Sequence, residues 1–358
     1  MSVDTNRAPG RFILTGSANL LQIPDLPDSL AGRIEIMRLG PLTQLELARR
    51  VEGSTLLERI FQPIQLGSDR VDRLGEDLIH RILAGGFPAA VARATHARQA
   101  LWLRNYIDTL VEKDIRELFS MQRPDVIFPL LKSAAARTAR LFNVTDIAAP
   151  LSLTRQTINV YLHHLENLFL IDRLPPWSSN RMSRLVKTPK LHLTDTGLAS
   201  ALLGVDEAAL NGERELLGQL VETFVYGEIR RQSQWSDDDY RFYHLRDKSG
   251  VEVDLVIERN GRTLCGVEVK AGATVGARDF KALARLRDAV GERFVSGIVL
   301  HDGEEILPFG DRLFAVSLSQ LWVVLVIRPS ENDDVRLNCQ ICRIYQEVVA
   351  NSINGCRE

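Results

Sequence analysis

The chain has 358 residues, which at roughly 150 residues per domain favours two or three domains over a single core. Hydrophobic residues make up 45% and charged residues 25% of the chain, a composition that excludes the collagen-like, low-complexity and disordered classes. The formal net charge of −2 excludes a globally basic nucleic-acid-binding protein, so a DNA partner requires a local basic patch.

No segment of the chain has the pattern of a membrane anchor or a signal peptide. The longest strongly apolar run, residues 321–327, is far shorter than the roughly 20 residues that cross a bilayer. Three of the four cysteines are Cys339, Cys342 and Cys356, which lack both the density of a disulfide framework and the partners of a zinc site. We therefore expect a cytoplasmic protein with no membrane partner.

The first part of the chain begins with strand-like patterns and continues with helical ones. Residues 11–17 read as a buried strand, and residues 34–39 alternate as a second strand. Helical spacing then runs from about 43 to 96 with a break at 85–88, and an amphipathic helix follows from about 97 to 119. A core strand so near the start indicates either a sheet edge or a domain whose earlier part is missing.

The stretch from 144 to 171 has the rhythm of a helix-turn-helix. A short helix ends before Pro150, and Thr154 is the expected N-cap of a second helix whose apolar residues share one face. The polar residues of that helix that could meet DNA are Arg155, Gln156 and Asn159.

A basic two-stranded wing is predicted from 173 to 193, so the middle of the chain reads as a winged-helix domain. Between Arg123 and Asp195 the chain carries ten Lys or Arg and five Asp or Glu, a local net charge of +5 that suits phosphate contacts. The module either binds DNA or connects domains and proteins, with its basic side chains as a solvated face. The wing residues assigned to DNA are Arg184, Lys187 and Lys190.

In the third region, acidic residues lie on a predicted helix and on two predicted strands. Glu222 lies among the apolar positions of a helix that begins near 218, and a buried carboxylate requires a partner or a metal. Residues 251–258 and 265–270 read as two strands joined by an Asn-Gly turn, with Asp254 on the first strand. Because strand side chains alternate, Glu268 and Lys270 share one face of the second strand.

Carboxylates and an ammonium at one place on a sheet suit a hard divalent cation, since Mg²⁺ prefers carboxylate oxygens and retains water. The chemistry that this favours is hydrolysis of a phosphodiester. The alternative is a structural ion-pair network in which Glu222 pairs with Lys270 or an arginine, while Glu252 and Glu258 face solvent.

Glu222, Asp254 in Val-Asp-Leu-Val and Glu268-Val269-Lys270 resemble the PD-(D/E)xK core of restriction-endonuclease-like proteins. The resemblance covers roughly residues 215–300, with Val253-Asp254 in place of Pro-Asp. It implies a catalytic set in which the three acids hold Mg²⁺, made of Glu222, Asp254, Glu268 and Lys270.

Further motifs follow in order along the chain: Gly-Arg-Phe-Ile-Leu-Thr-Gly-Ser-Ala-Asn, Ser-Leu-Ala-Gly-Arg, Gly-Gly-Phe-Pro, Thr-Asp-Thr-Gly-Leu and Gly-Val-Glu-Val-Lys. This order, over about residues 3–322, is similar to a bacterial and archaeal family of predicted ATPases. Those proteins join an AAA+-type ATP-binding domain to a C-terminal nuclease-like domain. The resemblance implies a nucleotide sensor at Thr15 and Ser17 and a phosphate-facing or intersubunit arginine at Arg33.

The phosphate-binding loop of that family is absent, because the sequence contains no Gly-x-x-x-x-Gly-Lys-Ser/Thr motif. This loop precedes the sensor strand in the family, so we expect the chain to lack roughly the first 80–100 residues. Without the loop the triphosphate has no cradle. ATP, a ligand of the family, is therefore not expected to bind to this chain alone.

We predict an α/β fold with a truncated P-loop-type (AAA+) remnant, a winged-helix domain and a C-terminal restriction-endonuclease-like mixed sheet with flanking helices. The expected divisions are residues 1–120, 121–200 and 201–322, with an unassigned tail at 323–358. The expected function is DNA-associated, Mg²⁺-dependent phosphodiester cleavage with no autonomous ATP hydrolysis. The alternative is a non-catalytic adaptor that binds DNA, a protein partner or a second copy of the chain.

Overall fold

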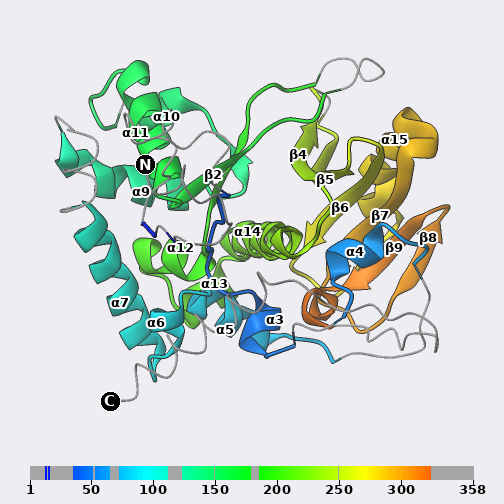
Figure 1. Ribbon diagram of the computed structural model, residues 1–358, viewed down its shortest axis with the longest axis horizontal. Helices are drawn as coiled ribbons and strands as arrows, with labels where there is room; N and C mark the ends of the chain where they lie inside the picture. Colours follow the sequence, from blue (N-terminus) through cyan, green and yellow to red (C-terminus); the bar gives the residue numbers. More distant parts are fainter. Residues whose placement is uncertain are drawn as a thin grey trace, which may run out of the picture.

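Two β-sheets, with helices between and around them, form the described part of the protein (Figure 1). The computed structural model describes residues 13, 15–16, 35–50, 53–64, 72–111, 123–148, 150–178, 185–248 and 250–323. One sheet has three strands and the other has six. The predicted mixed α/β class is thereby confirmed.

In the described part of the chain, helices form the first regular elements, and several begin at residues suited to a helix N-terminus. Thr43 and Thr55 each accept a hydrogen bond from the backbone N–H of a glutamate three residues on, whose carboxylate bonds back to the threonine N–H. Gly85, with a φ of 63°, ends one helix, and Pro88 opens the next, so the predicted break is confirmed. The helices are α3 (Gln44–Leu47), α4 (Leu56–Ile60), α5 (Glu76–Ala84), α6 (Pro88–Val91) and α7 (His96–Thr109).

The two strands predicted before residue 40 are not strands where the structure describes them. Ile36, Met37 and Leu39 are exposed, and segment 35–40 pairs with no other strand among the described residues. Ile13, within the first predicted strand, is 76% exposed rather than buried. A strand needs partners for its backbone N–H and C=O groups, so an apolar pattern alone does not produce one.

The middle of the chain forms a three-stranded antiparallel sheet with helices beside it. The helix that starts at Arg155 follows the predicted N-cap, because the hydroxyl of Thr154 accepts a hydrogen bond from the Thr157 N–H at 3.1 Å. The elements are η3 (Pro124–Val126), α9 (Ile127–Ala135), β1 (Arg140–Leu141), α10 (Val144–Ala148), α11 (Arg155–Asn167), β2 (Ile171–Leu174) and β3 (Lys190–Leu193). The strand order is β1-β3-β2.

Three helices connect the two sheets. The side chain of Asp195 caps the first by accepting from the Leu198 N–H at 2.8 Å, and it also accepts from the Gly86 N–H at 2.7 Å. The third helix lies near the middle of the view in Figure 1 and packs against the six-stranded sheet. These helices are α12 (Thr196–Leu203), α13 (Glu207–Gly212) and α14 (Arg214–Gln232), followed by η4 (Ser233–Trp235).

The six-stranded sheet is mixed: its first three strands are antiparallel, the next two pairings are parallel, and the last strand pairs antiparallel with its neighbour. Asn260 and Gly261, with φ angles of 54° and 64°, form the tight turn of the predicted hairpin. The elements are β4 (Tyr240–Arg246), β5 (Glu252–Arg259), β6 (Thr263–Lys270), η5 (Ala277–Phe280), α15 (Lys281–Val290), η6 (Gly291–Arg293), β7 (Phe294–His301), β8 (Leu307–Gly310), β9 (Leu313–Ser317) and η7 (Leu318–Trp322). Their strand order is β4-β5-β6-β7-β9-β8.

The segment between β2 and β3 reaches the six-stranded sheet and pairs with its edge strand β4 (Figure 1). The Trp177 N–H donates to the His244 carbonyl at 2.7 Å, and the His244 N–H donates to the Pro175 carbonyl at 3.0 Å. On the return, the Val186 N–H donates to the Arg246 carbonyl at 2.8 Å. The predicted wing is therefore, in its described part, a connection between the two sheets.

Candidate functional site

The site begins with Glu222 on α14. Val221 and Val225, its neighbours on the helix, are buried in the hydrophobic core. The side chain of Glu222 is only 17% exposed, so its carboxylate faces other side chains rather than open solvent. A carboxylate in this position requires a cationic partner.

Strand β5 adds two carboxylates, those of Glu252 and Asp254. They are two residues apart on one strand, so they share a face of the sheet. Asp254 also reaches the next strand, because its Oδ2 accepts a hydrogen bond from the Val269 N–H of β6 at 3.0 Å. This bond fixes Asp254 beside the end of β6.

Glu268 and Lys270 lie at that end of β6 and contact each other, with 2.9 Å between Oε1 and Nζ. Burial and the charge of Asp254 raise the pKa of Glu268 to about 8, although Lys270 opposes this effect. The two acids Asp254 and Glu268 are therefore close enough to repel each other.

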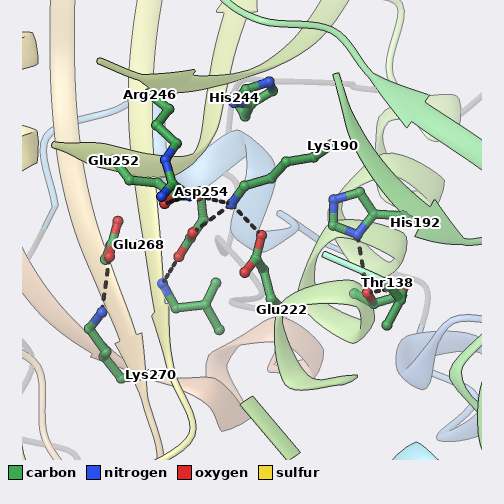
Figure 2. Close-up of polar contacts among 12 residues, drawn as sticks. Thr138, Lys190, His192, Glu222, His244, Arg246, Glu252, Asp254, Glu268 and Lys270 are labelled. Atoms are coloured by element: carbon green, nitrogen blue, oxygen red, sulfur yellow. Dashed lines mark hydrogen bonds and ion pairs between the residues drawn. The ribbon is translucent and has the colours of Figure 1, made fainter. Parts of the chain in front are cut away.

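A lysine from the other sheet, Lys190 of β3, lies between the carboxylates of α14 and β5 (Figure 2). Its Nζ is 2.7 Å from Glu222 Oε1, 2.7 Å from Glu252 Oε1 and 2.9 Å from Asp254 Oδ1, and the residue is 1% exposed. We call these four residues the lysine-centred cluster. Lys190 is thus not the exposed DNA-contacting cation that the sequence predicts, because the carboxylates hold its ammonium inside the protein. Glu252 likewise faces Lys190 instead of open solvent.

The charges of the lysine-centred cluster depend on one another. Burial opposes a charged ammonium, but attraction to the three carboxylates outweighs it and raises the pKa of Lys190 well above the ordinary value. Burial and the charge of Asp254 raise the pKa of Glu222 well above the ordinary value, against the effect of Lys190. The ammonium therefore stays charged at neutral pH, and the carboxylates compete for it.

Two histidines lie beside Lys190 (Figure 2). His192 Nδ1 is 3.1 Å from Thr223 Oγ1, and His244 Nε2 is 3.0 Å from the Thr188 carbonyl oxygen. Burial, followed by the charge of Lys190, lowers the pKa of His192 well below the ordinary value and the pKa of His244 to about 4. Both imidazoles are therefore neutral at neutral pH.

The arrangement does not fit a divalent cation as it stands. Glu222 and Asp254 contact Lys190, whereas Glu268 contacts Lys270, so the three acids predicted to hold Mg²⁺ do not face one point. Across the described ranges, no group of three or more His, Cys, Asp or Glu side chains is placed to hold a metal ion. The Lys190 ammonium takes the position between carboxylates that a metal would need.

The other predicted site residues lie away from the cluster or outside the described part of the chain. Arg155, Gln156 and Asn159 are exposed on α11, and Lys187 is exposed just before β3. Thr15 is exposed as well. Predictions were also made for residues that lie outside the described part of the chain: Ser17, Arg33, Arg184 and the tail from 324 onward with its three cysteines.

Sequence reasoning missed the roles of Lys190 and Glu252. The signal for Glu252 is its spacing of two from Asp254, which puts both side chains on one face of a strand. Lys190 and His192 are also two residues apart. Lys190, however, is the last residue of a basic stretch, and such a stretch is typical of an exposed wing. The carboxylates that contact Lys190 are distant from it in the sequence and meet it only in the folded chain.

Two family models match the chain. Residues 75–209 match a domain of unknown function (DUF8612), and residues 217–321 match another domain of unknown function (DUF4143). The second domain is commonly found in proteins associated with AAA-type ATPases. At this coarser level the match agrees with the resemblance seen in the sequence.

Two curated relatives are similar over most of the chain. They are the uncharacterized protein Mb2031c of Mycobacterium bovis and the uncharacterized protein Rv2008c of Mycobacterium tuberculosis, each 27% identical over 325 residues. The match covers 89% of this chain but 64% of each relative, so the chain spans less than two thirds of their length. No solved structure matches the chain. In the described part of the protein, no helix has the length and apolar character needed to span a membrane.

Proposed function

We propose that this chain is a DNA-binding adaptor whose nuclease-like C-terminal sheet does not cleave DNA while Lys190 occupies the lysine-centred cluster. The observation that carries the proposal is the position of the Lys190 Nζ, within 2.9 Å of three carboxylates and almost fully buried. Carboxylates held by an internal ammonium are not available to act on a phosphodiester. In this state the cluster connects the two sheets.

The DNA-binding part of the proposal rests on α11, which we interpret as the recognition helix of a winged-helix unit. Arg155, Gln156 and Asn159 are exposed in the first turns of the helix, the part that contacts base edges when such a helix enters the major groove. Arginine suits contacts with guanine or with phosphate, and glutamine and asparagine suit contacts with adenine. In Figure 1, α10 and α11 lie at one edge of the molecule, well separated from the six-stranded sheet.

Only part of the positive charge of the middle region is available to phosphate groups. Four of its cationic residues already contact acids, in the pairs Arg123 with Asp125, Arg140 with Glu215, Arg173 with Glu166, and Lys190 with its carboxylates. Exposed cations remain near α11 and the wing, among them Arg155 and Lys187. We therefore expect modest affinity that depends steeply on salt.

Fluorescence anisotropy of a labelled short duplex, measured with the full chain over a series of salt concentrations, tests this function. Arg155→Glu should weaken binding by about tenfold or more and reduce the slope of log affinity against log salt by about 1. The matched control is Arg98→Glu, which makes the same charge change at an exposed position of α7. Equal losses in both variants, or no binding by the wild-type chain, would contradict the proposal.

A second candidate function, hydrolysis of a phosphodiester, is favoured by the hydrogen bond that fixes Asp254 next to the Glu268–Lys270 pair. Plasmid DNA incubated with the chain and Mg²⁺ or Mn²⁺ separates the two functions. Cleavage by the wild type that is lost in both Asp254→Ala and Lys270→Ala supports the hydrolase. An intact plasmid supports the closed adaptor.

A further inference from the structure

A cavity of about 220 Å³ opens on the six-stranded sheet, where the segment after β2 runs along β4. The residues that line it are Trp177, Ser178, Tyr243, Glu258 and Arg293. Glu258 lies near the end of β5, whereas the lysine-centred cluster uses the start of the same strand. The cavity is therefore a separate site, and nothing in the proposed function uses it.

Strand pairing places the aromatic and acidic side chains of the cavity on one face of the sheet. Tyr243 of β4 is opposite Val256 of β5, and Glu258 is two residues beyond Val256, so Tyr243 and Glu258 are diagonal neighbours on that face. Trp177 belongs with Val256 to one core cluster, against which Tyr243 also packs. The two rings and the carboxylate therefore border the same space.

Three acceptors hold the guanidinium of Arg293 at the edge of the cavity. Its Nε donates to the Arg262 carbonyl at 3.0 Å. Its Nη2 donates to Glu258 Oε1 at 2.7 Å and to the Gly261 carbonyl at 3.4 Å. Because a guanidinium has five N–H groups, these bonds fix its position and leave the two N–H groups of Nη1 for a ligand.

Three of the side chains that line the cavity keep unused hydrogen-bonding groups within the described part of the chain. These groups are Nη1 of Arg293, the second carboxylate oxygen of Glu258 and the hydroxyl of Tyr243. The Glu258–Arg293 pair carries no net charge, so it offers donors and an acceptor without favouring an ion. The cavity therefore suits a neutral ligand that has both acceptors and donors on its edge.

The size of the cavity and its aromatic rings indicate a single flat ring system. Sites for drug-sized ligands measure roughly 300–1,000 Å³, which is more than the 220 Å³ available. Trp177 is only 5% exposed and closes the inner wall, whereas Tyr243 is partly exposed and offers its ring for stacking. Nucleobases stack on aromatic side chains of this kind.

We propose that this cavity binds a guanine base. Arginine donors suit O6 and N7 of guanine, and a carboxylate beside them suits the N1–H and N2–H₂ donors of the same base. Adenine lacks O6 and has a single amino group as its donor, so it satisfies fewer groups of the cavity. A free nucleotide and a single-stranded nucleic acid both present such a base, and the site does not depend on duplex binding by α11.

Isothermal titration calorimetry of the full chain with GMP tests the proposal, with AMP as the matched ligand. GMP should bind at one site and at least about tenfold more tightly than AMP, as expected for one well-placed bidentate contact. Equal affinities for the two nucleotides, or no binding of GMP up to millimolar concentration, would overturn the proposal. Because no duplex is present, this failure is distinguishable from a failure of the proposed function.

Variants of two lining residues assign the binding to this cavity. Glu258→Gln and Tyr243→Ala should each weaken GMP binding by at least about tenfold, through loss of an acceptor and of a stacking ring. The matched control is Glu292→Gln, the same change as Glu258→Gln at an exposed position next to Arg293. Glu258→Gln keeps the shape of the side chain, so it decides the outcome even if Tyr243→Ala does not fold. Wild-type GMP affinity in Glu258→Gln would overturn the proposal.

Short single strands distinguish the two sources of the base. Fluorescence anisotropy compares an oligodeoxyadenosine with the same strand carrying one central deoxyguanosine. Tighter binding of the second strand that is lost in Glu258→Gln would assign the site to single-stranded nucleic acid. Equal binding of the two strands, together with binding of GMP, would assign it to a free nucleotide. Equal binding of the strands without binding of GMP would overturn the proposal.

Discussion

At the residue scale, Lys190 makes three ionic contacts while exposing only 1% of its surface. Breaking a buried ion pair by removing one partner typically costs about 3–5 kcal/mol, because the remaining charge stays buried. In metal-free buffer, Lys190→Met should therefore lower the free energy of unfolding by about this amount, as measured by urea denaturation. Lys187→Met, at an exposed position, should change it by less than about 0.5 kcal/mol. Similar values for the two variants would show that the ammonium contributes little.

The raised pKa of Glu268 predicts how the free energy of unfolding depends on pH. Its pKa is raised from 4.5 to about 8 in the folded chain, so between these values the folded state binds a proton that the unfolded state has lost. This group therefore makes the free energy of unfolding fall as the pH rises through that range. Glu268→Gln removes the contribution, so the stability of the variant relative to the wild type should increase from about pH 5 to about pH 8. Urea denaturation across that range checks this, and parallel pH profiles would contradict it.

Some residues of the site are predictable from their neighbours in the sequence, whereas the role of Lys190 depends on residues far away in the chain. Asp254, Glu268 and Lys270 were recognisable because their spacing on strands fixes which side chains share a face. The role of Lys190 depends on carboxylates that lie 32 and 64 residues further along the chain. A lysine is usually exposed, and only the folded chain shows that this one is enclosed.

At the element scale, Asp195 joins the start of α12 to the turn that precedes α6. Its carboxylate accepts hydrogen bonds from the Leu198 and Gly86 N–H groups at 2.8 and 2.7 Å, and the residue is buried. Asp195→Ala removes a helix cap and leaves the Gly86 N–H without its acceptor, at a cost of about 2–4 kcal/mol in the free energy of unfolding. Asp195→Asn keeps one acceptor oxygen and should cost less. Thermal or urea unfolding of the two variants checks this order, and equal losses would contradict it.

Elements with local signals were predictable, and those that depend on distant partners were not. The N-cap at Thr154 and the Asn260-Gly261 turn appear as expected, because capping and turn geometry are set within a few residues. The alternating pattern of residues 34–39 predicts a strand, but the described part of this segment has no partner strand among the described residues. The two strands near 173–193 were expected, whereas their attachment to β4, about 60 residues away, was not.

At the scale of the whole molecule, the segment between β2 and β3 links the two sheets in two ways. Its backbone extends the edge of the six-stranded sheet at β4, and at its end Lys190 enters the carboxylates of α14 and β5. Covering an edge strand also protects it from pairing with other chains. The segment therefore ties the three-stranded sheet to both the edge and the buried carboxylates of the larger sheet.

Crystals of the wild-type chain grown with Mn²⁺, with anomalous diffraction collected for manganese, address the closed cluster directly. We expect no anomalous peak between Glu222, Glu252 and Asp254, and density for the Lys190 ammonium at that point. An anomalous peak among these three carboxylates, with Lys190 turned away, would show that the wild-type chain keeps the site open to metal.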